Sequence, residues 1–169
     1  MTNNQTTASS QHPEFTIQRI YVKDLSLECP QSPHSFQEEW QPELNLQFTK
    51  NTRSLAESTY EMVLQITVTA ISKDKTLFLV EVNQAGLFTL KGFTDEQNQQ
   101  ILHITCPTIL FPYAREAVSD LVGRAGFPPL YLAPVNFEAL YAQQIQEQSK
   151  KEDGTPIKKA NSQNSIITH

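Results

Sequence analysis

The chain has 169 residues, of which 38% are hydrophobic, and its length is that of about one domain. The net charge is −5; residues 150–169 hold four lysines against one glutamate and one aspartate, so residues 1–149 carry −7. This acidic body argues against a nucleic acid as partner, because phosphate contacts need clustered lysine and arginine.

Both ends of the chain are polar and lack apolar periodicity. We therefore predict disordered segments at residues 1–13 and 149–169 around one domain at residues 14–148. The N-terminus has no basic segment followed by an apolar one, and no apolar run approaches the length of about 20 residues that spans a bilayer. We expect a cytoplasmic protein that does not insert into the membrane. Cys29 and Cys106 form no CxxC motif and are expected to be free thiols in a reducing compartment.

Four strands are predicted in the first part of the chain. Residues 15–22 alternate, continue through a bulge to residue 27 and stop at Pro30. A second strand carries Leu44, Leu46 and Phe48, and residues 50–58 are interpreted as a polar turn. Residues 60–70 show the cleanest period-2 pattern, and the polar turn at 72–75 joins them to a strand at 76–86 as an antiparallel hairpin.

Helices are predicted after the strands. Residues 94–102 suit a short helix, and the next helix is expected to begin at Thr108 as N-cap and to end at Gly123 or Gly126. Residues 127–134 contain three prolines, so this crossover must run extended before Asn136 caps a last helix. Four strands followed by two main helices predict an α+β fold, with the helices on one face of an antiparallel sheet.

One sheet and two helices in so short a chain are expected to leave a face of each element uncovered. A second subunit is the commonest cover for such faces, so oligomerisation is expected. The expected interface combines one strand face with the apolar stripe of the long helix: Phe78, Val80, Gln84, Leu110, Ala114, Ala117, Val118 and Leu121.

The motifs of common enzyme classes are missing from the sequence. There is no GxSxG, no GxxxxGK[ST] and no GxGxxG, and the four histidines pair with no cysteine or carboxylate at ligand spacing. Gly123–Gly126 lacks the lysine of a phosphate loop and is interpreted as a helix C-cap. We expect no enzyme activity, no metal and no cofactor.

Apolar residues in irregular segments are the remaining unusual feature. Core packing explains each of them alone. As a set they can line a groove between the crossover and the sheet, which would bind extended polypeptide through apolar pockets and backbone hydrogen bonds. The set is Phe36, Trp40, Leu44, Leu46, Phe127, Leu130, Tyr131 and Leu132.

Seven segments follow the order of a known family's pattern. They are FTIQRIYVKDLSLE at 15–28, WQPE at 40–43, YEMVLQITVTA at 60–70, FLVEVNQAGLF at 78–88, CPTILFPYARE at 106–116, DLV at 120–122 and FPPLYLAPVNFEAL at 127–140. Together they resemble the SecB family of bacterial protein-export chaperones. The resemblance implies a Greek-key sheet with two helices that assembles as a homotetramer, a dimer of dimers. It also implies an ATP-independent chaperone that binds unfolded precursors, keeps them translocation-competent and delivers them to the ATPase SecA.

A possible docking face can also be identified on the strands. Asp24 and Glu28 are four residues apart in one strand, and Leu79 and Glu81 are two apart in another, so each pair shares a face. From the residues alone, this is an ordinary solvated face. The resemblance implies that the four lie on the flat outer sheet face that docks SecA, whose basic C-terminal segment carries its own zinc. The alternative function is a generic oligomeric scaffold that binds unfolded polypeptide without secretory coupling.

Overall fold

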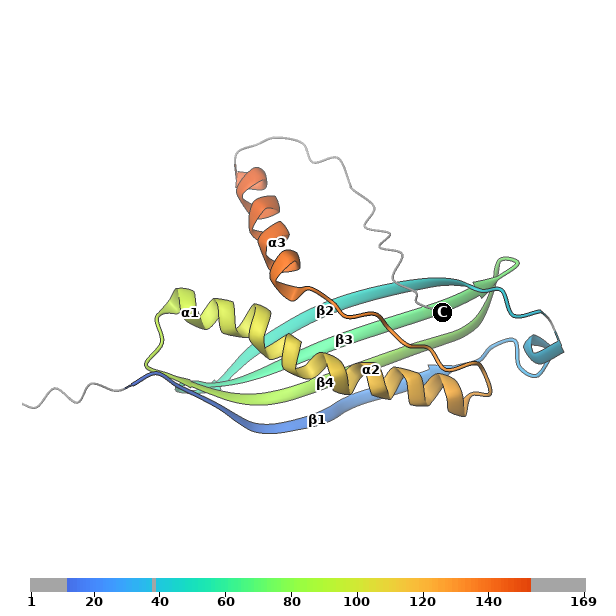
Figure 1. The fold of residues 1–169 in the computed structure, drawn as a ribbon, viewed down its shortest axis with the longest axis horizontal. Helices are drawn as coiled ribbons and strands as arrows, with labels where there is room; N and C mark the ends of the chain where they lie inside the picture. Colours follow the sequence, from blue (N-terminus) through green and yellow to red (C-terminus); the bar gives the residue numbers. More distant parts are fainter. Residues whose placement is uncertain (1–11, 38, 153–169) are drawn as a thin grey trace, which may run out of the picture.

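The computed structural model describes residues 12–37 and 39–152 and shows a four-stranded antiparallel sheet with a long helix lying across one face (Figure 1). The strands are β1 (Glu14–Glu28), β2 (Glu43–Ala56), β3 (Thr59–Ser72) and β4 (Lys75–Lys91). The helical segments are the 3₁₀ turn η1 (His34–Gln37), α1 (Asp95–Gln100), the π-helical η2 (Ile101–Thr105), α2 (Cys106–Arg124) and α3 (Phe137–Glu152). The spatial order β1-β4-β3-β2 is a Greek key, in which the connection at residues 29–42 lets β1 lie beside β4. The predicted α+β fold is confirmed.

Turn chemistry and pairing fix the strand boundaries. Lys73 and Asp74 adopt left-handed φ values of 48° and 62° between β3 and β4, as a two-residue hairpin turn requires. β2 continues to Ala56, so the interpretation of residues 50–58 as a turn is wrong. Those polar side chains lie on an edge strand whose pairing with β3 holds them extended, and only residues 57 and 58 separate the two strands.

α2 and the sheet of the same chain bury each other. We call the covered face the inner face and the opposite one the outer face. Seven apolar side chains on the inner face of β3 and β4 are at most 1% exposed: Met62, Leu64, Ile66, Val68, Phe78, Val80 and Val82. Burial of each of these side chains stabilises the fold by roughly 1.5–3 kcal/mol.

This burial corrects the expectation that one subunit cannot cover these faces. Six of the residues expected at an oligomer interface are buried inside the single chain: Phe78, Val80, Gln84, Leu110, Ala114 and Val118. The side chains of Ala117 and Leu121 are partly buried against the same core. The buried Gln84 amide is satisfied internally, because its Nε2 donates to the Tyr21 carbonyl at 2.9 Å. The physical reason is that the stripe of α2 turns toward its own sheet.

The long helix α2 begins earlier than the sequence indicates, because it continues an already helical segment. Thr94 and Gln97 form a capping box, so the short helix predicted at residues 94–102 is confirmed as α1. It runs on through η2 into α2, and Thr108 is therefore not an N-cap but an inner residue whose hydroxyl donates to the Ile104 carbonyl at 2.6 Å. Gly126, with φ of 88°, follows the end of α2, and the Asn136 side chain caps α3 by accepting from the Ala139 amide at 3.0 Å.

The structure describes only part of the two terminal segments. Residues 1–11 and 153–169 of the two segments expected to be disordered lie outside the described residues. α3 extends to Glu152, beyond the expected boundary at residue 149. Within the described residues, no helix is long and apolar enough to cross a membrane.

Candidate functional site

Four aromatic rings from distant segments meet where the crossover passes the sheet. The Phe127 ring centroid lies 5.1 Å from that of Phe36, 5.3 Å from that of Trp40 and 5.2 Å from that of Phe78. Phe78 and Phe127 are buried, whereas Phe36 is 50% and Trp40 is 38% exposed. This aromatic cluster (Phe36, Trp40, Phe78 and Phe127) therefore presents two half-open rings on a fixed apolar base.

The structure divides the residues that were predicted to line one groove. Phe127 and Leu132 belong to the buried core, and Leu44, Leu46 and Leu130 pack partly buried against it. Phe36 and Trp40 stay half-exposed in the aromatic cluster, and Tyr131 is 59% exposed. Three of the eight are thus open to a client, and the other five pack wholly or partly in the core; in the crossover, Leu130 and Leu132 pack against the core while Tyr131 between them is exposed.

An open groove lies between α2 and the crossover. Figure 1 shows the crossover running back alongside that helix toward α3. The groove has a volume of about 930 Å³. Its apolar lining comes from both segments and from the start of α3: Phe111, Pro112, Pro129, Tyr131, Pro134, Val135 and Phe137. Of these residues, only Tyr131 was identified from the sequence. The other six were not predicted to line a site, and three prolines in the crossover were the available signal for an extended wall.

The polar rim of this α2–crossover groove carries charges of both signs. Asp120 and Arg124 form an i,i+4 ion pair at 2.7 Å, and Arg115 and Glu116 line the same groove. The rim is exposed, so such a pair contributes only about 0.2–1 kcal/mol. An apolar floor with a mixed polar rim suits a chain segment of varied sequence.

The four residues of the predicted docking face do lie on the outer face. Glu28 pairs across the strands with Leu79, and Asp24 pairs with Asn83, which lies two residues beyond Glu81 on β4. Asp24 and Glu28 are four residues apart, which corresponds to about 13 Å along β1. Glu81 accepts a hydrogen bond from the Asn83 amide at 3.2 Å. We call Asp24, Glu28, Leu79 and Glu81 the acidic face.

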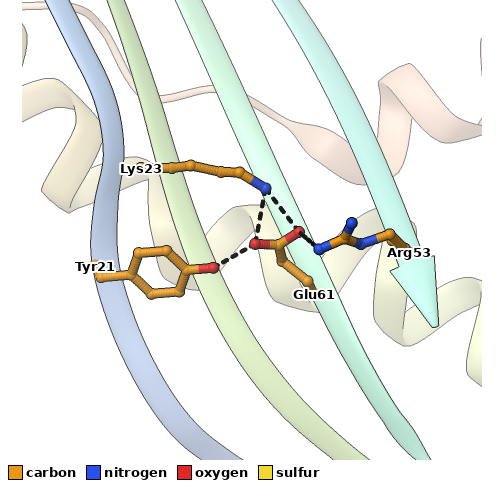
Figure 2. Close-up of polar contacts among 4 residues, drawn as sticks. All are labelled: Tyr21, Lys23, Arg53 and Glu61. Carbon is orange, nitrogen blue, oxygen red and sulfur yellow. Dashed lines mark hydrogen bonds and ion pairs between the residues drawn. The ribbon is translucent and has the colours of Figure 1, made fainter. Parts of the chain in front are cut away.

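A second set of charges on the outer face escaped sequence reasoning. Figure 2 shows Glu61 of β3 bound by Tyr21 and Lys23 of β1 and by Arg53 of β2. Hydrogen bonds from Lys23 and Tyr21 hold the pKa of the Glu61 carboxyl below its ordinary value, and the bond to Glu61 raises the pKa of the Tyr21 hydroxyl. The Glu61 cluster (Tyr21, Lys23, Arg53 and Glu61) thus ties β1 to β3 across β4. No sequence motif predicts this cluster, because its four residues come close to one another only after the sheet has formed.

Nothing in the described part of the chain gathers three or more histidine, cysteine, aspartate or glutamate side chains into a possible metal site. Both cysteines are free. Burial raises the pKa of the Cys106 thiol to about 12, so it is poorly suited to nucleophilic chemistry at neutral pH.

Comparisons with known proteins agree with this description. The family described as "Preprotein translocase subunit SecB" matches residues 8–148. The protein-export protein SecB of Nitrosococcus oceani is 56% identical over 148 residues, covering 86% of this chain and 90% of that protein. The protein-export protein SecB of Methylobacillus flagellatus is 51% identical over 155 residues, and the match covers 92% of this chain and 99% of that protein.

A solved structure shares the fold. A SecB-like chaperone of Mycobacterium tuberculosis, in complex with a peptide from an antitoxin, superimposes with a TM-score of 0.58. The sequences are 22% identical, and the match covers 72% of this chain and 87% of that one. This likeness supports the α+β Greek-key architecture.

Proposed function

The chain belongs to the SecB family of protein-export chaperones, and we propose that it binds unfolded precursor polypeptides in the cytoplasm and delivers them to SecA. It keeps them translocation-competent without ATP and without catalysis. The observation that carries this proposal is the aromatic cluster, in which half-exposed Phe36 and Trp40 rings stand on buried Phe127. Exposed apolar surface of this kind marks an interaction site.

Client binding is assigned to two neighbouring surfaces. Phe36 and Trp40 supply apolar contacts at one side of the crossover, and the α2–crossover groove supplies an extended channel at the other, beside Tyr131. Apolar pockets set along an extended track suit a chain without secondary structure, because side-chain contacts there need little sequence specificity. A folded protein buries the apolar side chains that its unfolded form would place in these pockets, so folded proteins are expected to bind poorly.

Delivery to SecA is assigned to the acidic face. Three carboxylates around Leu79 lie on the outer face, opposite the inner face that α2 covers. A basic partner segment would gain on-rate and specificity from these charges. A generic scaffold without secretory coupling is the alternative, and it would have no use for this face.

Assembly as a homotetramer is also proposed, but on other residues than the buried stripe. The side of α2 that faces away from the sheet leaves Tyr113 51% exposed, and edge strand β1 leaves Ile17 42% exposed. Unpaired edge strands and apolar helix faces are common subunit contacts. Light scattering at micromolar concentration tests this, and a monomer mass would contradict it.

The central test is a titration with a chemically unfolded polypeptide, with the folded form of the same polypeptide as control. The unfolded form should bind without nucleotide and with a negative heat-capacity change from apolar burial. Equal binding of both forms, or a requirement for ATP, would contradict the proposal. A second titration with the SecA C-terminal segment separates the export chaperone from the scaffold, because only the former should bind it.

A further inference from the structure

Lys23 and Asp24 are consecutive in β1, yet both line one depression on the outer face. Strict alternation would send consecutive side chains to opposite faces of a sheet. The register between β1 and β4 shifts between Val22 and Asp24, so Lys23 is an extra residue in the strand. Such a β-bulge turns both side chains to the same side. The Lys23 side chain therefore leaves β1 next to that of Asp24, one of the carboxylates of the acidic face.

The lysine is nevertheless bound elsewhere. Its Nζ lies 2.9 Å from Oε1 and 2.8 Å from Oε2 of Glu61, and Arg53 lies 3.4 Å from the same carboxylate (Figure 2). The Glu61 side chain is only 7% exposed, whereas that of Lys23 is 43% exposed. A buried carboxylate is thus fixed, while the lysine stem lies over the sheet surface.

The carboxylates of the acidic face have no such partners. Among the described residues, no lysine or arginine forms an ion pair with Asp24, Glu28 or Glu81. The Glu61 cluster holds one negative and two positive charges, a net +1, beside three unopposed carboxylates. These six groups therefore sum to −2, with both of their cations bound to one carboxylate.

We propose that Glu61 is a positioning residue for partner docking: it holds the Lys23 ammonium away from Asp24 and so keeps the acidic face open to a basic segment. The inference rests on the proposed docking of SecA. Without the Glu61 charge, the same six groups would sum to −1, and the flexible Lys23 stem would be free to pair with Asp24. An exposed pair of that kind would compete with the partner and weaken docking about twofold to fivefold.

The test uses the full chain and the zinc-loaded C-terminal segment of SecA in low salt, where exposed charges are least screened. Glu61→Gln keeps the shape of the side chain and removes only the charge. It should weaken SecA binding about twofold to fivefold, because Lys23 then competes for Asp24. Binding of unfolded polypeptide should stay unchanged.

Two further variants separate charge sequestration from a structural role. Adding Lys23→Met to Glu61→Gln should restore the wild-type affinity for the SecA segment, because the competing ammonium is gone. Tyr21→Phe removes one hydrogen bond to Glu61 but no charge, so it should lower the melting temperature and leave SecA affinity unchanged. Lys23→Met alone, with Glu61 intact, should change affinity less than about twofold, because Glu61 already holds that charge.

The outcomes are distinct. Unchanged SecA affinity in Glu61→Gln, no recovery in the double variant, or an equal loss of client binding would each overturn the positioning role. If Glu61→Gln does not fold, a gain much above twofold in Lys23→Met would overturn it instead. A wild-type protein that does not bind the SecA segment would refute the docking itself, and that failure appears before any variant is compared.

Discussion

Replacing Phe36 by alanine should weaken client binding without unfolding the protein. The Phe36 ring is 50% exposed and rests on Phe127, with 5.1 Å between ring centroids. An aromatic side chain buries about 150–250 Å², so about 100 Å² of this ring is available to a client. At about 25 cal/mol per Å², full coverage is worth about 2.5 kcal/mol and half coverage about half of that. We therefore expect Phe36→Ala to weaken binding by a factor between about eight and 60.

The assay can use the only tryptophan of the sequence as its reporter. Trp40 lies 5.3 Å from Phe127 between ring centroids and is 38% exposed. A client without tryptophan should shift Trp40 emission to the blue as it covers the cluster. The same signal gives the dissociation constant of the wild type and of Phe36→Ala.

A matched control lies near the far end of β2, where Leu55 is 47% exposed. Leu55→Ala removes an equally open apolar side chain outside the aromatic cluster, so it should change client affinity less than about twofold. Urea unfolding must show that Phe36→Ala remains folded under the assay conditions. Equal losses in Phe36→Ala and Leu55→Ala would mean that clients bind any apolar surface, and no loss in Phe36→Ala would refute the assignment of the cluster.

Three other predictions concern the packing and stability of the fold. A Cβ on Gly86 would lie 2.6 Å from the buried Phe88 ring and 3.0 Å from Leu110 Cδ2. Gly86→Ala should therefore lower the free energy of unfolding in urea by about 1–3 kcal/mol, and an unchanged unfolding midpoint would contradict this packing. Because its hydrogen bonds lower the pKa of Glu61 below 4.5, its contribution to stability is complete above pH 4.5 and is lost as the pH falls through the lowered pKa. Glu61→Gln should therefore lose less stability than the wild type in acid, and parallel acid-unfolding curves would speak against it. Burial raises the pKa of the Cys106 thiol to about 12, so iodoacetamide at pH 8 should modify the half-buried Cys29 first, as mass spectrometry of peptides would show; early labelling of Cys106 would refute its burial.

The sequence by itself determined the strands with a strong local signal. Alternation along residues 60–70 has one physical solution, a strand with one buried face, and the hairpin turn at Lys73 and Asp74 follows from polar residues that tolerate positive φ. The cap at Asn136 and the extended crossover are likewise local, because an amide side chain and three prolines act on their own neighbours. Parity within each strand also predicted the shared faces of Asp24 with Glu28 and of Leu79 with Glu81.

Tertiary structure decided which apolar face meets which. The stripe of α2 and the inner row of β4 both suit an interface between subunits, and only the path of the chain shows that they cover each other. The same ambiguity affected the crossover, where Phe127 and Leu132 are needed in the core while Tyr131 opens toward α2. Hydrophobic burial is not directional, so a pattern shows that a face will be covered but not by what.

The charges on the outer face were the least accessible to sequence. Glu61 is one acidic residue in a strand, and its partners come from β1 and β2, eight or more residues away along the chain. The bulge that turns Lys23 and Asp24 to one side breaks the alternation on which any reading of faces depends. Long-range pairing brings these groups within hydrogen-bond reach, and the strength of each bond depends on the burial that the folded sheet provides.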